Sequence, residues 1–251
     1  MSYTGLELSI VSNFYFDQKS ADSLYEMLEN YASYPPELMQ KIQFVLVDDH
    51  SKIPITIRPD LPLNYQLFRI KNDITWNNGG ARNLGVVKAR TSKILMTDID
   101  HFFPEKLLWK IVRHRSMNNT FYKFKRLDVN GKKMRSQPNI LYLTKGLFFD
   151  ALGYDEEFCG NYGSEDSFFL DIMKHRRNRL RYLSRWIKIE ERKVDRQNAY
   201  HSFSRDINVN QDLRIEKRKI IKMKGTFAGH SRLFLNFQWE KVTEQMNAIP
   251  K

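Results

Sequence analysis

The chain has 251 residues, 41% of them hydrophobic, which is enough for one large α/β domain and excludes wholesale disorder. Its single cysteine, Cys159, excludes an internal disulfide framework and a cysteine zinc site. The formal net charge of +12 favours an anionic partner such as nucleic acid, an acidic lipid surface or an acidic glycan, although net charge also serves solubility alone.

The sequence pattern predicts no signal peptide and no membrane-spanning segment. No uninterrupted apolar run approaches the ~20 residues that cross a bilayer, and the first residues lack a basic start and a small-residue cleavage site. Together with the low cysteine content, this predicts a cytoplasmic protein. Lys and Arg concentrate in the last third of the chain, which is compatible with peripheral contact with the anionic inner face of a membrane.

The first hundred residues alternate predicted strands with predicted helices. Strands are expected within 6–15, 42–51, 65–70 and 92–100, and helices over 20–34, with Ser20 as the N-cap, and over 77–91. Because these strands are almost wholly apolar, they indicate an α/β fold with a mostly parallel central sheet flanked by helices.

The later part of the chain changes character after Pro104. We expect a helix over 104–115, strands within 120–129 and 139–144, and a helix that begins at Ser164. The predicted division is a domain over 1–205, made of halves 1–100 and 101–205, followed by a basic, helical, amphipathic C-terminal extension over 206–251. This extension is expected either to contact an anionic membrane, or to pack over the half formed by residues 101–205 or against another subunit.

Polar residues follow three of the predicted strands. Ser12 and Asn13 follow the first, the pair 48–49 follows the second, and Asp98 and Asp100 follow the fourth. Ligands of open α/β sheets bind beyond the carboxyl ends of the strands, so these residues jointly predict a site. Any one of them alone would be weak evidence, because aspartate commonly caps strands and helices.

Two aspartates in "ILMTDIDHFF" stand two positions apart. On extended backbone their carboxylates point the same way and repel each other, so a positive group is expected beside them. Asp98 and Asp100 suit Mg²⁺ or Mn²⁺, with open positions for substrate phosphates. His201 is a candidate third ligand, since imidazole suits Mn²⁺, although a lone histidine is more often structural.

Five short stretches occur in the order typical of one enzyme family: "LSIVSNFYFD", "FVLVDDHS", "NNGGARNLGVVKA", "ILMTDID" and "FCGNYGSEDSFFL". The chain resembles nucleotide-sugar glycosyltransferases of the GT-A fold, in the large inverting family of chondroitin- and hyaluronan-type synthases and many bacterial capsule and lipopolysaccharide transferases. The last stretch also resembles the Gly-Trp-Gly-Gly-Glu-Asp motif of the β-1,4-galactosyltransferases. The resemblance covers residues 6–205.

The resemblance implies that residues 1–100 bind the nucleotide and 101–205 bind the acceptor. Asp49 would bind the base, usually uracil, with Asp48 beside it. The backbone around Ser12 and Asn13 would form part of the same base pocket.

Further roles follow for the helix and metal motifs. Arg82 and Asn83 match a helix start that faces the nucleotide, with roles that vary within the family. Asp98 would lie nearer the ribose, and Asp100 would coordinate Mn²⁺ or Mg²⁺. His201 matches the histidine that often completes the metal shell.

The implied reaction is a single displacement with inversion. Asp166 matches the catalytic base, and Glu165 its neighbour that contacts donor or acceptor sugar. The donor would be a nucleotide-diphosphate sugar, UDP being the usual nucleotide, and the acceptor a hydroxyl of a glycan or lipid-linked glycan. Glu165 should raise the proton affinity of Asp166. Tyr162-Gly163-Ser164 replaces the usual tryptophan-glycine-glycine, so the sugar identity cannot be transferred.

Two other functions are compatible with part of the pattern. A nucleotidyltransferase also pairs carboxylates with a metal, but it would usually have a glycine-rich basic loop after the first strand, and "VSNFYFD" lacks both glycine and lysine. A basic nucleic-acid-binding module would use the positive charge and the aromatic residues. The acidic strand ends argue against it, so we expect no nucleic acid partner.

Overall fold

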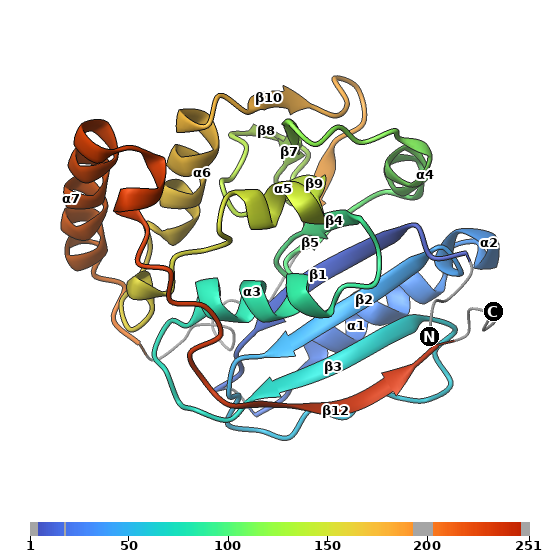
Figure 1. The fold of residues 1–251 in the computed structure, drawn as a ribbon. Helices are drawn as coiled ribbons and strands as arrows, with labels where there is room; N and C mark the ends of the chain where they lie inside the picture. Colours follow the sequence, from blue (N-terminus) through green and yellow to red (C-terminus); the bar gives the residue numbers. More distant parts are fainter. Residues whose placement is uncertain (1–4, 18, 193–202, 247–251) are drawn as a thin grey trace.

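The computed structural model describes residues 5–17, 19–192 and 203–246 (Figure 1). His201 therefore lies outside the described residues. Among the described helices, none is both long and apolar enough to cross a membrane.

An eight-stranded mixed sheet forms the centre of the fold. Its strands lie in the order β10 (Arg179–Tyr182), β6 (Thr120–Lys123), β9 (Leu141–Thr144), β4 (Lys93–Met96), β1 (Leu8–Phe14), β2 (Ile42–Asp48), β3 (Asn64–Ile70) and β12 (Trp239–Gln245). Strands β4, β1, β2 and β3 run parallel, whereas β9 and β12 are antiparallel to their neighbours. The predicted α/β fold with a mostly parallel sheet is confirmed.

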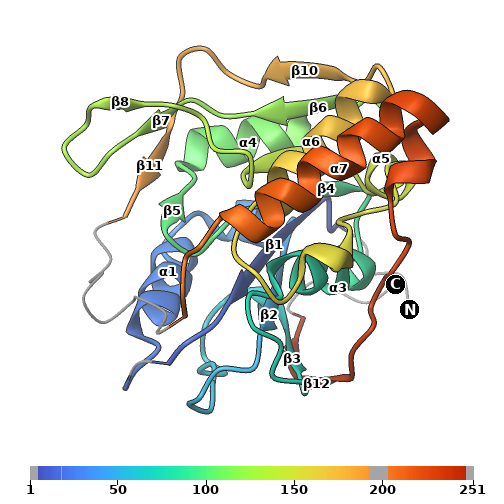
Figure 2. The same ribbon diagram turned by 90° about the vertical axis from the view of Figure 1, so that its left-hand side faces the viewer.

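Helices cover both faces of this sheet (Figures 1 and 2). One face packs against α1 (Asp22–Ala32), α2 (Pro36–Met39) and α4 (Glu105–Arg113). The other face packs against α3 (Asn78–Lys88), α5 (Lys145–Asp150), the 3₁₀ turn η1 (Glu156–Phe158) and α6 (Glu165–His175). Both faces are buried, which explains why the parallel strands are apolar at nearly every position.

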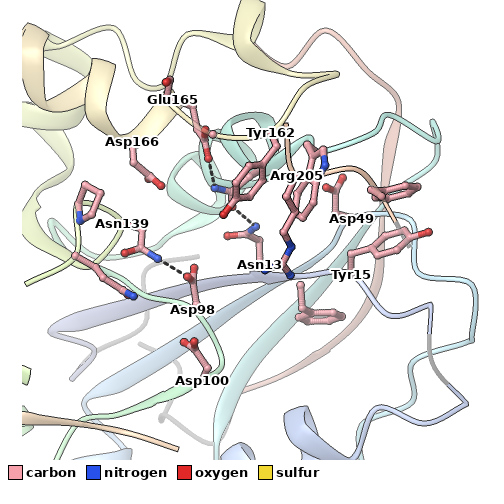
Figure 3. A pocket seen from close by; sticks show the side chains of 18 of the residues that line it. Asn13, Tyr15, Asp49, Asp98, Asp100, Asn139, Tyr162, Glu165, Asp166 and Arg205 are labelled. Carbon is pink, nitrogen blue, oxygen red and sulfur yellow. Dashed lines mark hydrogen bonds between the residues drawn. The ribbon is translucent and has the colours of Figure 1, made fainter. Parts of the chain in front are cut away.

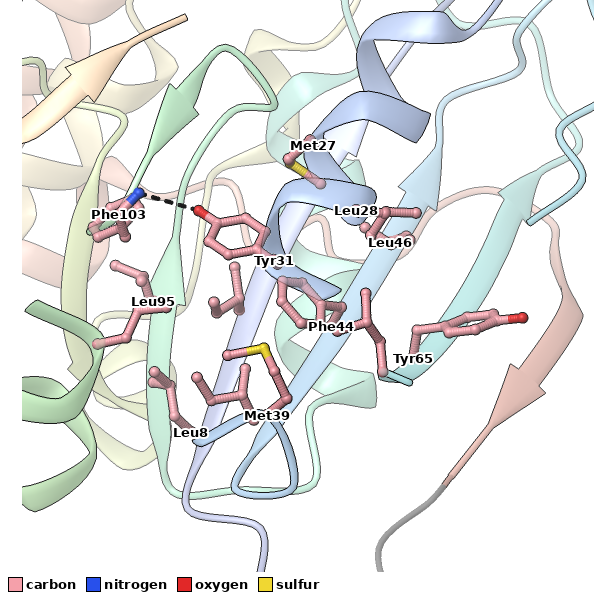
Figure 4. Packing of buried hydrophobic residues seen from close by; sticks show 14 of the residues in the cluster. Leu8, Met27, Leu28, Tyr31, Met39, Phe44, Leu46, Tyr65, Leu95 and Phe103 are labelled. Atoms are coloured by element: carbon pink, nitrogen blue, oxygen red, sulfur yellow. Dashed lines mark hydrogen bonds between the residues drawn. The ribbon is translucent and has the colours of Figure 1, made fainter. Parts of the chain in front are cut away.

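Alternate strand residues belong to different halves of the core. In β2, Phe44 and Leu46 point to the α1 side, whereas Val45 and Val47 point to the α3 side, as the two-residue period of a strand requires. On the α1 side, Tyr31 lies among Leu8, Phe44 and Leu95, and its hydroxyl accepts a hydrogen bond from the backbone N–H of Phe103 at 3.2 Å (Figure 4). This bond satisfies a polar group that would otherwise be buried without a partner.

A second sheet of short strands lies next to the end of β4. It contains β5 (His101–Phe102), β11 (Ile189–Glu191), β7 (Arg126–Leu127) and β8 (Lys133–Met134), in that order. The backbone N–H of Arg192 donates to the carbonyl of Asp100 at 2.8 Å. The small sheet thus holds the backbone that follows the predicted metal motif.

The C-terminal segment differs from the predicted extension of helices and a loop. Helix α7 (Asn208–Lys224) and the 3₁₀ turn η2 (Thr226–Gly229) are present, but the chain then forms β12, antiparallel to β3. Trp239 begins this strand and packs against Phe68. "WEKVTEQ" is mainly polar because β12 is an edge strand, so it gave no apolar strand signal. The predicted domain boundary at residue 205 stays a prediction.

Buried ion pairs attach this segment to the central domain. Lys217 of α7 donates to Asp155 at 2.8 Å, and both side chains are almost fully buried. The carboxylate of Glu156 accepts from the backbone N–H groups of Leu235 and Asn236 at 2.7 and 3.0 Å. These bonds align the chain toward β12.

One helix boundary and one strand boundary also differ in detail from the sequence-based expectation. Helix α1 begins at Asp22 with Ala21 at the N-cap, and Ser20 donates to the Asp22 side chain instead. Strand β4 ends at Met96, so neither Asp98 nor Asp100 belongs to the strand, and Asp100 lies in a turn.

We expect Gly85→Ala to destabilise the protein by about 1–3 kcal/mol, because a Cβ at this position of α3 would overlap the side chain of Val11 in β1. Urea unfolding followed by circular dichroism measures this change. Gly146→Ala in α5 is the matched control, since its Cβ would meet no atom within 4 Å. Equal stability of the two variants would contradict the close packing of α3 on the sheet.

Candidate active site

A cavity of about 580 Å³ opens beyond the carboxyl ends of β1, β2 and β4 (Figure 3). Five acidic side chains line it: Asp49, Asp98, Asp100, Glu165 and Asp166. The structure thus brings the strand-end carboxylates together with the acidic pair that begins α6. So many carboxylates in one cavity repel each other unless positive groups lie among them.

The loop before α6 aims the acidic pair into the cavity. Gly160 and Gly163 have φ angles of 100° and 83°, and Ser164 has φ 69°, all in the left-handed region that favours glycine. Helix α6 begins directly afterwards, at Glu165, and the side chain of Ser164 makes no capping hydrogen bond. The positive end of the helix dipole is favourable for both carboxylates.

A buried arginine joins the two ends of the carboxylate cluster. Arg82 of α3 is 1% exposed and donates to Asp98 Oδ1 at 2.6 Å and to the carboxylate of Asp166. It also donates weakly to the hydroxyl of Tyr154 at 3.4 Å. The sequence predicted a divalent cation as the positive charge beside Asp98, and the structure shows a guanidinium there.

A chain of amide side chains connects Arg82 with Glu165. Arg82 Nε donates to Asn13 Oδ1 at 3.3 Å, Asn13 donates to Asn78 at 2.7 Å, and Asn78 donates to Glu165 at 2.7 Å (Figure 3). The predicted side chain of Asn13 thus lies inside the site. This network fixes Glu165 relative to the end of β1.

Burial and neighbouring charges set the pKa of Asp166. Burial raises its pKa to about 7, Arg82 acts against this rise, and the negative charges of Glu165 and Asp98 add to it. The predicted influence of Glu165 on the proton affinity of Asp166 is confirmed. A carboxyl group with this pKa can exchange protons near neutral pH.

Asp49 lies at the opposite end of the cavity from Asp166 (Figure 3). Its backbone N–H donates to the carbonyl of Phe14 at 2.8 Å, which holds the end of β2 against the end of β1. Burial raises the pKa of its side chain to about 8. Its Oδ1 atom is buried and has no hydrogen-bond partner among the described residues, so a donor from a ligand would satisfy it.

The two aspartates of the predicted metal motif have different surroundings. Asp98 accepts hydrogen bonds from Arg82 and from Asn139. Asp100 Oδ1 contacts His101 Nδ1 without hydrogen-bond geometry, and it is buried with no hydrogen-bond partner among the described residues. Burial acts to raise the pKa of Asp100, but the contact with His101, the charge of Arg126 and a backbone hydrogen bond together hold this pKa below its ordinary value.

These donors fit a hard cation in part. In the described ranges, no group of three His, Cys, Asp or Glu side chains is arranged to hold a metal ion. Asp98 and Asp100 nevertheless supply two carboxylates to the same cavity, and carboxylate oxygens are the ligand type that Mg²⁺ and Mn²⁺ prefer.

Four predicted residues do not line the cavity: Ser12, Asp48, Arg82 and Asn83. Arg82 reaches the site through its bonds to Asp98 and Asp166. Ser12 is buried inside β1. Asp48 accepts from the backbone N–H of Ser51 at 2.8 Å and pairs with Arg69, which stabilises the turn after β2.

Asn83 instead holds the loop that leads to η1. Its side chain donates to the carbonyl of Tyr154 and to Glu156, each at 2.9 Å, and accepts from the N–H of Tyr154 at 2.8 Å. Because Tyr154 also contacts Arg82, Asn83 supports the site indirectly.

The sequence-based prediction missed an aromatic wall of the cavity. Trp76 packs against Tyr162 with ring centroids 4.7 Å apart, and Phe203 packs against Tyr15 at 5.2 Å. The Arg205 guanidinium lies 5.9 Å from the ring centroids of Trp76 and Tyr162 (Figure 3). These residues come from four distant segments, so no local motif marks them.

The fold is similar to that of solved nucleotide-sugar glycosyltransferases. TarS of S. aureus in complex with UDP-GlcNAc has a TM-score of 0.59 and 16% identity, over 89% of this chain and 69% of the TarS chain. A Drosophila β1,4-galactosyltransferase 7 complex with xylobiose has a TM-score of 0.55 and 11% identity, over 98% of this chain and 91% of the other. GalNAc-T7 with UDP, GalNAc and Mn²⁺ has a TM-score of 0.57 and 14% identity, over 85% and 48%.

These similarities establish a GT-A-like fold for the chain. No protein family profile and no curated protein sequence matches it. At such low identities the likeness concerns the fold, and the roles of individual residues rest on the site itself.

We expect Asp49→Asn to change the pH dependence of stability. The ordinary pKa of this carboxyl is 3.8 and burial raises it to about 8, so the folded state holds a proton that the unfolded state releases. Stability should therefore fall between about pH 4 and pH 8, by at most about 1.4 kcal/mol per pH unit. Asp49→Asn should remove this loss. Urea unfolding at about pH 5.5 and about pH 8.5 measures the difference in stability.

The exposed carboxylate of Asp60, paired with Arg58 at 3.6 Å, provides a control. Asp60→Asn should keep the pH dependence of the unmodified protein. If Asp49→Asn keeps it as well, the Asp49 carboxyl is ionised in the folded state and the expected burial effect is wrong.

Proposed function

We propose that this protein is a metal-dependent glycosyltransferase that moves a sugar from a nucleotide-diphosphate donor, a UDP-sugar, to a hydroxyl of a glycan or lipid-linked glycan with inversion. The observation that carries the proposal is the shared cavity in which Asp98 and Asp100 lie with a largely buried Asp166, 16% exposed, whose pKa is raised. The GT-A-like fold supports the same function. The cytoplasmic location expected from the sequence is part of the proposal.

The base of the donor would bind at Asp49. The unpartnered Oδ1 of Asp49 can accept a hydrogen bond from a base N–H such as the imide of uracil. Tyr15 lines the same end of the cavity (Figure 3). This arrangement directs the diphosphate and the sugar toward the opposite end, where Asp98 and Asp166 lie.

Asp98 and Asp100 would hold Mn²⁺ or Mg²⁺, with His201 as the third ligand implied by the resemblance. When bound, the cation neutralises the charge that develops on the departing nucleoside diphosphate. Asp98 must then share its carboxylate between the cation and Arg82, which donates to it at 2.6 Å. Asn139 also donates to Asp98 and limits the rotation of its carboxylate.

Asp166 would take the proton of the acceptor hydroxyl. Its pKa of about 7 balances ionisation at neutral pH against proton affinity, as general base catalysis requires. Arg82 contacts the Asp166 carboxylate and favours its ionised form, against the effect of burial. Glu165, fixed by Asn78 at 2.7 Å, is positioned to contact a sugar hydroxyl. Attack by the activated hydroxyl in one displacement gives inversion at the anomeric carbon.

Two substitutions separate binding from chemistry. Purified protein would be assayed for binding and turnover of UDP, GDP, CMP and dTDP sugars, with Mn²⁺ and with a chelator. Asp100→Asn should lose metal-stimulated nucleotide binding. Asp166→Asn should keep nucleotide binding and lose roughly 10²- to 10⁴-fold in turnover.

Asp60→Asn, on the surface, is the control and should match the unmodified protein. If every donor binds equally with and without metal, the assignment of Asp98 and Asp100 is wrong. Retained turnover in Asp166→Asn would assign the base to another residue. NMR of the product anomer tests inversion directly.

The pH profile of the reaction should report the ionisation of Asp166. We expect kcat/KM to rise with pH through about 7, because only the ionised carboxyl accepts the proton. Arg82→Lys should move this rise in kcat/KM to higher pH. A lysine ammonium cannot contact Asp98 and Asp166 with the planar donor geometry of arginine, so it favours the ionised form of Asp166 less. A limb near the ordinary pKa of aspartate, unchanged by Arg82→Lys, would argue against Asp166 as the base.

A further inference from the structure

A surface with exposed basic and apolar side chains lies outside the lining of the cavity. It combines β10, the loop 183–188 and the hairpin of β7 and β8, all in the upper part of Figures 1 and 2. The hydroxyl groups of Ser136 and Tyr182 lie 3.2 Å apart and connect the chain after β8 with β10. We call this surface the β10 face.

Positive charge on the β10 face has few negative neighbours. No Asp or Glu occurs between Lys174 and Lys188, a span rich in arginine. The exposed cations on the face include Lys133, Arg179, Arg181 and Arg185. In the part of the chain that the structure describes, none of these four cations forms an ion pair within 4.0 Å with a carboxylate. Such a surface attracts anions over a distance of about one Debye length.

Strand β10 exposes apolar side chains as well. All four of its residues are exposed, and in the described sheet it pairs with β6 alone. Arg179 and Arg181 point to one side of the strand, and Leu180 and Tyr182, which are 41% and 49% exposed, point to the other. Edge strands are commonly protected by charged residues, so exposed Leu180 and Tyr182 need another explanation.

Further apolar side chains extend the face. Trp186, in the loop after β10, is 88% exposed, the largest value among the exposed large hydrophobic residues of the described chain. Val129 and Met134 of the hairpin are 48% and 41% exposed. Leu180 and Tyr182 share the free edge of the sheet with Arg179 and Arg181, although the two pairs point to opposite sides of β10. Exposed apolar side chains close to cations mark a binding site more often than isolated ones do.

We propose that the β10 face docks the protein on an anionic lipid bilayer. Arginine and lysine bind lipid phosphates, tryptophan and tyrosine favour the headgroup level, and aliphatic side chains enter the acyl boundary. A free polyanion such as nucleic acid would satisfy the cations but would leave Leu180 and Met134 without an apolar partner. A bilayer satisfies both kinds of side chain, and this proposal does not depend on the proposed catalytic function.

This surface differs from the segment that the sequence suggested for membrane contact. In the C-terminal segment, Phe234, Leu235, Phe237 and Trp239 pack against the core. The cations Arg214 and Arg218 of α7 pair with Asp171 at 2.8 and 3.7 Å. Much of its apolar and cationic side-chain surface is therefore already used within the protein.

Vesicle co-sedimentation of the full chain tests the proposal. Vesicles of phosphatidylcholine alone would be compared with vesicles that contain about 30% phosphatidylglycerol, where each basic residue near the surface adds about 1 kcal/mol. We expect binding to the anionic vesicles only, with loss at high salt. Arg179→Glu with Arg181→Glu should weaken binding by roughly tenfold or more, and Trp186→Ala should weaken it severalfold.

Matched controls come from α7. Lys222→Glu with Lys224→Glu makes the same change in net charge on exposed residues, and Met223→Ala removes a side chain that is 73% exposed. Both controls should bind vesicles like the unmodified protein. Circular dichroism verifies that each variant folds.

Three outcomes would overturn the proposal. Equal weakening by the β10-face and α7 variants would mean that net charge alone drives binding. Equal binding to neutral and anionic vesicles would exclude the arginine contacts. If the β10-face variants lose binding to a single-stranded oligonucleotide or an anionic polysaccharide but keep vesicle binding, the face binds a polyanion instead.

Discussion

The charge balance around Arg82 is the constraint on which the site depends. A buried guanidinium loses its hydration, at a cost of several kcal/mol, and this cost is offset when carboxylates bind it closely. Asp98 comes from the turn after β4 and Asp166 from the first turn of α6, so one charge on α3 holds three segments in register. The carboxylates of the cavity gain the positive neighbour that their mutual repulsion requires.

The strands and the strand-end acids were predictable because their signals are local. Apolar runs such as "IQFVLV" indicate buried strands wherever they occur, and parallel strands bring Asn13, Asp49 and Asp98 to one edge of the sheet. The acidic pair at the start of α6 carried a helix-start signal in its own neighbours. Much of the fold and the acidic lining of the cavity followed from such short-range patterns.

The remaining features depend on contacts between distant residues. Arg82 was expected at a helix start that faces the nucleotide, but its pairing with Asp166 emerges only when α3 and α6 pack on the same side of the sheet. The aromatic wall of Trp76, Tyr162 and Phe203 likewise joins separate loops. Asp48 and Asn83 are polar residues of the kind that is common in binding sites. Their side chains instead form hydrogen bonds with backbone groups, which gives them structural roles.

The antiparallel pairing of β3 with β12 has a consequence for folding during synthesis on the ribosome. Ile70 pairs with Trp239, so the outer edge of β3 cannot form its hydrogen bonds with β12 until residues 239–245 have been synthesised. During synthesis β3 remains an open, largely apolar edge, which can pair with another nascent chain. Once β12 has formed, its pairing with β3 covers this edge, so that the edge can no longer pair with another chain and aggregate.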